Sequence, residues 1–193
     1  MKQAKILTET EIKRVKAIIK GNRYATRNMA MFVLGLNVGL RAKEIATLKV
    51  GDVLSVDGTI RSECVLTAEQ TKRNEANRIF LNVVVQKQLK KYFDENEHLQ
   101  ANLNGCLFQS KNYKGFTPKT VGDLFARIFE IANIKEASSH SLRRTFATKL
   151  ADNSTSVFAI QKLMRHKNIS TTQLYVNVTD TQLLNATNNL NFG

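Results

Sequence analysis

A nearly continuous apolar segment, residues 27–40 (RNMAMFVLGLNVGL), most constrains the fold of this chain. Its residues tolerate helix formation, and a helix that is apolar on almost every side must be buried. We therefore predict a central helix that ends near Gly39 and is surrounded by other elements. A second short helix is expected over residues 41–48 (RAKEIATL), which places Arg41 at the junction of the two helices.

Amphipathic helices are predicted on both sides of this segment. In residues 7–21, Thr8 is a candidate N-cap, Glu11 follows three residues later, and Gly21 ends the pattern. Pro118 is expected in the first turn of a later helix. The helices predicted after the central one cover residues 83–98, 117–134, 141–152, 156–164, 170–178 and, more weakly, 180–188.

Residues 50–82 differ in composition from the helical segments before them. β-Branched residues appear with a VDG turn signal, and residues 60–66 (IRSECVL) and 78–82 (RIFLN) have the composition of strands. They flank a polar segment, residues 67–77 (TAEQTKRNEAN), which suits the tip of a hairpin. The predicted fold class is therefore mainly α with a small antiparallel β-sheet (α+β), organised as one compact domain.

The charge balance indicates a polyanionic partner. The chain has 29 Lys and Arg against 16 Asp and Glu, a formal net charge of +13, and these cations are spread from Lys2 to Lys167. No run of 18 apolar residues exists, so neither a membrane span nor a signal peptide is expected. Cys64 and Cys106 form no CxxC pair, and we expect buried free thiols in a protein of the reducing cytoplasm.

Two pairs of residues have helical spacing and could grip an anion. His140 and Arg143 are three residues apart, so their side chains share one helix face if the helix includes both. The alternative for this pair is a capping histidine beside a solvated arginine. The alternative for Arg41 and Glu44 is a local ion pair with no further role.

The order of the motifs distinguishes these pairs from chance. GLRAKEI follows the buried helix, TK lies in the hairpin, HSLRRTFAT opens a helix, and LMRHKNISTTQLY comes last. In this order the chain resembles the catalytic domain of the tyrosine recombinase, or phage integrase, family over about residues 8–178. The resemblance implies that fold, with residues 1–178 as the catalytic domain and residues 179–193 as a C-terminal segment that docks on a neighbouring protomer.

The resemblance also implies a catalytic set. Six positions carry the residues of the family pattern, namely Arg41, Lys72, His140, Arg143, His166 and Tyr175. Arg73 is a rival of Lys72 for the hairpin position. The family pattern usually has glycine where this chain has Arg165 and often aspartate where it has Ser141, and we expect Arg144 to contact phosphate or lie on the surface.

The implied chemistry agrees with the properties of these side chains. Two guanidiniums, Arg41 and Arg143, can hold the nonbridging oxygens of a phosphodiester while negative charge accumulates on them. A tyrosine hydroxyl has an ordinary pKa of about 10, so it needs help to become a nucleophile, and His140 is the candidate base.

The remaining residues complete the implied reaction. Tyr175 ends attached to a 3′ phosphate, and Lys72 protonates the leaving 5′ hydroxyl as general acid. His166 donates a hydrogen bond to a nonbridging oxygen. A second 5′ hydroxyl can then attack the phosphotyrosine, so no cofactor and no metal is implied.

The expected function is therefore site-specific recombination of double-stranded DNA by a homo-oligomer, with four subunits on two synapsed sites. One alternative is a catalytically silent DNA-binding accessory protein with the same fold. Another is a helical transcriptional regulator in which the motifs are coincidental. The domain that clamps DNA before the catalytic domain in typical members is not seen, which suits either an excised fragment or a short invertase-like member.

Overall fold

The computed structural model describes residues 4–71, 75–110, 114–175, 184 and 187–188. The chain divides into two compact units, residues 1–146 and 147–193. The boundary falls inside helix α7, which runs from Ser139 to Asp152. The predicted division into a catalytic domain of residues 1–178 and a tail of residues 179–193 stays a prediction.

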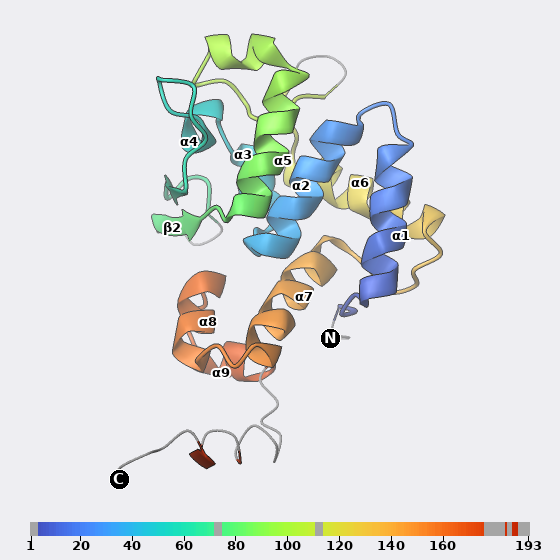
Figure 1. Ribbon diagram of the computed structural model, residues 1–193, viewed down its shortest axis with the longest axis vertical. Coiled ribbons are helices and arrows are strands. Elements are labelled where there is room, and N and C mark those ends of the chain that lie inside the picture. The colour runs from blue at the N-terminus through green and yellow to red at the C-terminus, as the bar shows by residue number, and fades with distance from the viewer. Residues whose placement is uncertain (1–3, 72–74, 111–113, 176–183, 185–186, 189–193) are drawn as a thin grey trace. The chain divides into compact units, whose positions relative to one another are not determined.

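The first unit contains most of the helices and a two-stranded sheet (Figure 1). Before α7 its elements are α1 (Glu9–Lys20), α2 (Ala25–Asn37), α3 (Ala42–Thr47), α4 (Val50–Val53), β1 (Glu63–Leu66), β2 (Asn77–Phe80), α5 (Val83–Asp94), the 3-10 helix η1 (Glu97–Ala101) and α6 (Pro118–Ile131). The second unit contains the end of α7, then α8 (Val157–Met164) and α9 (Ile169–Gln173). The fold is mainly α with a small antiparallel sheet, as predicted.

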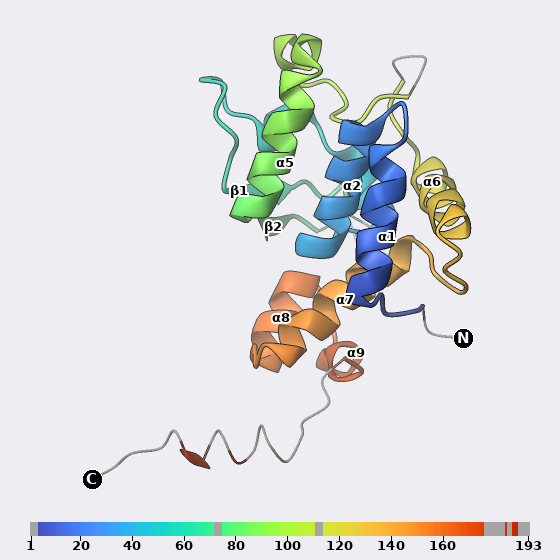
Figure 2. The ribbon, with the colours of Figure 1, turned by 45° about the vertical axis from the view of Figure 1, so that its right-hand side comes forward.

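Helix α2 is the centre of the first unit, which confirms the central buried helix. All its residues from Thr26 to Gly35 are buried, and α1 and α5 pack against it (Figures 1 and 2). Phe32 contacts Phe125 of α6 with ring centroids 6.5 Å apart. Each large apolar side chain buried in this way contributes roughly 1.5–3 kcal/mol to folding.

Local sequence signals fix the ends of several helices as predicted. Thr8 and Glu11 form a capping box at the start of α1, and Gly21 is its C-cap. Thr117 caps α6, and Pro118 lies at the first helical position, where its missing N–H costs no hydrogen bond. Ser156 caps α8 by accepting a hydrogen bond from the N–H of Ala159.

Strands β1 and β2 pair in the antiparallel register Glu63↔Phe80 to Leu66↔Asn77. Cys64, Leu66 and Ile79 point into the core. On the opposite face Val65 and Phe80 remain exposed, and Arg78 lies over the Phe80 ring. The predicted hairpin is confirmed, and this alternation of buried and exposed residues is the period-two pattern of a half-buried sheet.

The short helix α4 was not predicted, and Asp52 Oδ2 stabilises its first turn by accepting a hydrogen bond from the Lys49 N–H. Two expectations about local structure were wrong. Helix α9 ends at Gln173, so Tyr175 follows the helix instead of lying within it. Cys106 is exposed, while Cys64 is buried, and both are free thiols.

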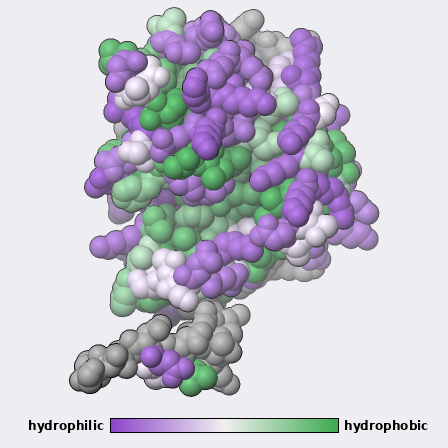
Figure 3. All heavy atoms as spheres, viewed as in Figure 1, coloured by the Kyte–Doolittle hydropathy of each residue, from purple (hydrophilic) through white to green (hydrophobic). Residues whose placement is uncertain are grey.

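Apolar and hydrophilic residues alternate over the face seen in Figure 3. Several large apolar side chains stay exposed around the hairpin and the start of α5, namely Val65, Phe80, Val83 and Val84. Of the helices that the structure describes, none combines the length and the apolar character needed to cross a membrane.

Candidate functional site

The junction of α2 and α3 positions Arg41. Its backbone N–H donates to Glu44 Oε2 at 2.8 Å, and its Nη1 lies 2.7 Å from Glu44 Oε1. Glu44 is fully buried, so the carboxylate is a fixed acceptor that holds the guanidinium in one orientation. The local ion pair is therefore present, and it orients Arg41 at the N-terminal end of α3.

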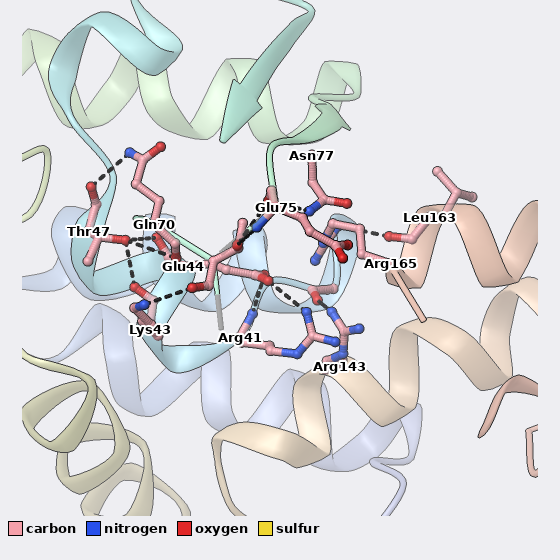
Figure 4. A network of polar contacts seen from close by, with 12 residues as sticks. Arg41, Lys43, Glu44, Thr47, Gln70, Glu75, Asn77, Arg143, Leu163 and Arg165 are labelled. Carbon is pink, nitrogen blue, oxygen red and sulfur yellow. Dashed lines mark hydrogen bonds and ion pairs between the residues drawn. The ribbon is translucent and has the colours of Figure 1, made fainter. Parts of the chain in front are cut away.

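Arg143 approaches the same junction from α7. Its Nη1 donates to the carbonyl oxygen of Gly39, and the residue is only 6% exposed. Gly39 lies two residues before Arg41, so the carbonyl that anchors the Arg143 guanidinium is close in the chain to the residue that carries the other guanidinium. Figure 4 shows both arginines within one network of polar contacts. The alternative of a solvated Arg143 is wrong.

Close packing between α7 and α2 supports this geometry. A Cβ atom at Gly35 would lie 2.7 Å from Leu142 Cδ1, and one at Gly39 would lie 2.5 Å from Phe146 Cδ1. Gly39 also has a φ of +64°, in the left-handed region that favours glycine. Only residues without a side chain allow the helix that carries Arg143 to approach this closely.

His140 lies in the first turn of α7, one turn before Arg143, and its side chain is exposed. Helix α7 therefore begins earlier than predicted and includes both members of the pair. Ser141 stabilises this start, because its Oγ accepts a hydrogen bond from the Ser138 N–H at 3.0 Å. A serine thus caps the helix at the position where the family pattern often has aspartate.

Arg144 is partly buried and contacts the segment before α1, and its expected contact with phosphate stays a prediction. Its Nη1 donates to the carbonyl oxygen of Ala4, and the neighbouring Thr145 Oγ1 accepts a hydrogen bond from the Leu7 N–H at 2.9 Å. These two residues fasten the segment before α1 to the helix of Arg143. The sequence did not indicate this contact because its partners are separated by about 140 residues.

Lys72 and its rival Arg73 lie outside the described residues. The residues on either side are described, and Thr71 links them. Its Oγ1 donates to the Glu75 carbonyl at 2.9 Å and accepts from the Glu75 N–H at 3.2 Å. The two ends of the segment that carries Lys72 are thus held together.

The second unit places His166 and Tyr175 beside each other. Their rings are stacked, with centroids 6.1 Å apart and an angle of 24° between the planes. His166 Nδ1 lies 3.0 Å from Thr172 Oγ1, and Thr172 is fully buried. Tyr175 N–H donates to the Thr172 carbonyl at 3.0 Å. Thr172 therefore positions both the histidine ring and the tyrosine backbone.

The backbone before His166 has the left-handed conformation that the family pattern assigns to glycine. Arg165 has φ 54° and ψ 45° at the C-terminal end of α8. The His166 N–H donates to the Gln161 carbonyl at 3.1 Å, and Gln161 Nε2 donates back to the His166 carbonyl at 3.2 Å. The arginine thus keeps the glycine-type turn at an energetic cost, and Gln161 fixes the backbone of His166.

The structure brings the predicted residues together in two groups. Arg41, His140 and Arg143 lie around the α2–α3 junction and the start of α7 in the first unit, and His166 and Tyr175 are adjacent in the second. Sequence reasoning missed Gly39, Gln161 and Thr172, which position them. Within the described part of the chain, no three or more His, Cys, Asp or Glu side chains gather as a metal site would require.

The chain is similar in sequence to proteins of known families. The sequence profile of the phage integrase family matches residues 5–182. The tyrosine recombinase XerC of Caldanaerobacter subterraneus subsp. tengcongensis is 32% identical over 185 residues, which cover 94% of this chain and 50% of that protein. The chain therefore spans about half the length of this relative.

Solved structures share the fold. The crystal structure of XerA recombinase has a TM-score of 0.75 at 23% identity, and the match covers 100% of this chain and 68% of that one. The Tn1549 transposon integrase in complex with circular intermediate DNA has a TM-score of 0.73 at 21% identity, covering 99% and 67%. These likenesses confirm the predicted recombinase fold.

Proposed function

This chain belongs to the phage integrase family, and we propose that it breaks and rejoins double-stranded DNA at specific sites through a covalent bond between Tyr175 and a 3′ phosphate. The observation that carries the proposal is the pair of anchored guanidiniums. Glu44 holds the guanidinium of Arg41. The carbonyl oxygen of Gly39, two residues before Arg41, holds the guanidinium of Arg143. Two guanidiniums fixed in this way can bind the nonbridging oxygens of one phosphate.

The arginine pair can stabilise the negative charge that develops during the reaction. Attack on a phosphodiester accumulates negative charge on the nonbridging oxygens, and prepositioned donors stabilise that charge without reorganising. A guanidinium presents its N–H groups in a rigid fork that matches two oxygens. The contacts of Arg41 Nη1 with Glu44 and of Arg143 Nη1 with the Gly39 carbonyl restrict the direction in which each fork can bind phosphate.

The nucleophile and its partners supply the remaining steps. Tyr175 attacks phosphorus and gives its proton to His140 as general base, and the 5′ oxygen leaves with a proton from Lys72. His166, oriented by Thr172, donates a hydrogen bond to a nonbridging oxygen. The phosphotyrosine conserves the energy of the broken bond, so attack by another 5′ hydroxyl completes the exchange.

Double-stranded DNA is the proposed partner. The net charge of +13 supports a polyanion, and the Tn1549 integrase that shares the fold was solved with DNA. Contacts between cations and phosphates release condensed counterions, so binding should weaken steeply as salt rises. A flat salt response would argue against this use of the basic surface.

Exchange between two DNA sites requires several protomers, and we propose four on synapsed DNA. Most of residues 179–193, the segment proposed to dock on a neighbouring protomer, lie outside the described residues. The free thiols of Cys64 and Cys106 suit a cytoplasmic protein. Truncation after Val178 should impair assembly on DNA while leaving binding to a single site largely intact, and unchanged assembly would exclude this role.

A strand-exchange assay tests the proposal against its binding-only alternative. A labelled duplex from the DNA that flanks the gene is mixed with an unlabelled duplex carrying the same site, in buffer with EDTA and without ATP. The proposal predicts joint molecules with the native protein and none with Tyr175→Phe. Tight, salt-sensitive binding without joint molecules would instead support an accessory protein with this fold.

A further inference from the structure

The base of the hairpin loop is bound to the helix that begins beside Arg41. Lys43 in α3 donates from Nζ to the carbonyl oxygen of Thr71 at 2.7 Å. Thr71 is buried and directly precedes Lys72 in the sequence. The contact therefore joins α3 to the last described residue before the segment that carries the predicted general acid.

A second contact on the same face of α3 strengthens this link. Thr47 lies four residues after Lys43 on the same face of α3, and its Oγ1 donates to the Gln70 carbonyl at 3.4 Å. The Thr47 carbonyl accepts a hydrogen bond from Gln70 Nε2 at 2.9 Å. Gln70 Nε2 also donates to Asp52 Oδ2 at 2.6 Å. Gln70 is buried and fixes the end of β1 against both α3 and α4.

The returning arm of the loop is fixed as well. Glu75 exchanges two hydrogen bonds with Thr71 Oγ1, and its carbonyl accepts another from Asn77 Nδ2 at 2.7 Å. Figure 4 shows Lys43, Thr47, Gln70 and Glu75 in this network. The residues on both sides of segment 72–74 are thus held by hydrogen bonds, Thr71 to Lys43 and Glu75 to Thr71.

We propose that Lys43 is a positioning residue that holds the base of this loop so that Lys72 can protonate the leaving 5′ oxygen. The proposal rests on the proposed function. Arg41 precedes α3, and Lys43 lies in its first turn, so one short helix carries a phosphate-binding guanidinium and also anchors the arm of the general acid. Proton transfer needs its donor within hydrogen-bond reach of the leaving oxygen, and such an anchor restricts where the donor can lie.

The chemistry of the leaving group offers a direct test. In cleavage of ordinary DNA, the Tyr175–phosphorus bond forms, the phosphorus–O5′ bond breaks, and Lys72 gives its proton to the 5′ oxygen. With a 5′-bridging phosphorothiolate the leaving atom is sulfur, which departs as a stable thiolate and needs no proton. Loss of a residue that serves only the proton transfer should therefore slow cleavage of the first substrate and spare the second.

The experiment measures single-turnover cleavage of both substrates by the native protein and by Lys43→Met, Lys72→Ala and the double variant. General-acid catalysis contributes roughly 100-fold or more, so Lys72→Ala should lose about that factor on the oxygen substrate. Lys43→Met should lose about tenfold on the oxygen substrate and less than about twofold on the phosphorothiolate, since a displaced donor is impaired but not removed. In the Lys72→Ala background, Lys43→Met should cause no further loss.

Two results would overturn the proposal. Equal slowing of both substrates by Lys43→Met would show a role in folding or DNA binding, and additional slowing in the Lys72→Ala background would show that Lys43 acts independently of Lys72. Lys16→Met removes the same charge from an exposed position of α1 and should cleave both substrates like the native protein. Absence of cleavage by the native protein on both substrates would contradict the proposed function itself.

Hydrogen–deuterium exchange tests the anchor without DNA. Lys43→Met should increase exchange in residues 70–76 while leaving α2 and α6 unchanged, and equal protection in both proteins would overturn the anchor. If Lys43→Met does not fold, Lys43→Gln provides the second disruption of the contact with the Thr71 carbonyl. It removes the charge and shortens the side chain but keeps a polar end, and it should give the same selective loss on the oxygen substrate.

Discussion

The carbonyl oxygen of Gly39 accepts a hydrogen bond from Nη1 of Arg143. This contact ties the loop before α3 to α7 and is possible because residue 39 has no side chain. A methyl group there would meet the ring of Phe146, in the helix turn that follows Arg143. The glycine before the first predicted arginine therefore positions the second.

Substitution of Gly39 tests this relationship. Gly39→Ala should lower the free energy of unfolding by roughly 2–4 kcal/mol, because left-handed strain of about 1 kcal/mol adds to overpacking against Phe146. Gly58 is the matched control, since its φ is +79° and nothing lies near its Cβ position. Gly58→Ala should cost only about 1 kcal/mol. Urea unfolding measures both, and equal losses would show that the contact with Phe146 is unimportant.

Thr172 should matter for cleavage through His166. Thr172→Val keeps the shape of the buried side chain and removes the hydroxyl that pairs with His166 Nδ1. We expect cleavage to slow by about tenfold, because the ring loses the partner that orients it. The same substitution in a His166→Ala protein should have little effect on the rate. Additive losses would show that Thr172 acts in another way.

The left-handed turn at Arg165 predicts a stabilising substitution. Glycine adopts φ 54° without the Cβ strain that arginine and alanine both experience. Arg165→Gly should therefore be about 1 kcal/mol more stable than Arg165→Ala, and comparison of these two variants cancels the loss of the arginine side chain. Thermal unfolding measures the difference. A more stable alanine variant would show that the turn does not keep this conformation.

Stability at high pH should depend on Tyr92. Burial raises the pKa of Tyr92 to about 12, above its value of about 10 in the unfolded chain. The folded state therefore favours the neutral phenol. Its contribution is fully present below pH 10 and is lost as the pH rises from about 10 through about 12, on the order of 2–3 kcal/mol.

The Phe variant isolates that dependence. Tyr92→Phe should lose roughly 1 kcal/mol at neutral pH, because the Leu107 carbonyl loses its donor, but it should decline less between pH 10 and pH 12. Tyr24→Phe, at a half-buried position, serves as the control and should keep the native decline. Urea unfolding across this range gives the slopes. Parallel curves for native protein and Tyr92→Phe would contradict the assignment.

Residue patterns were sufficient to predict features that depend on neighbours in the sequence. Hydrophobic spacing located the buried α2, the capping box at Thr8 and Glu11 located α1, and the turn composition located the hairpin. The sequence placed Arg41 at the junction of two helices and His166 just after the end of a helix, where the structure has them. The position of Lys72 stays a prediction.

Contacts between residues far apart in the sequence could not be predicted from residue patterns. The hydrogen bond from Lys43 to Thr71 joins residues that are 28 positions apart, and that from Arg144 to Ala4 spans almost the whole first unit. Tyr175 was expected within a helix because its neighbours suit helix formation, but α9 ends at Gln173. Each of these features depends on tertiary packing, which local propensity does not encode.

Covalent trapping tests the central claim most directly. The full chain is incubated with nicked or bulged duplexes from the DNA that flanks its gene, so that cleavage releases a short strand and religation is prevented. Denaturing electrophoresis followed by peptide mass spectrometry should show a DNA adduct on Tyr175 that is absent from Tyr175→Phe. Tight binding without an adduct, or an adduct that persists in the Phe variant, would contradict the account.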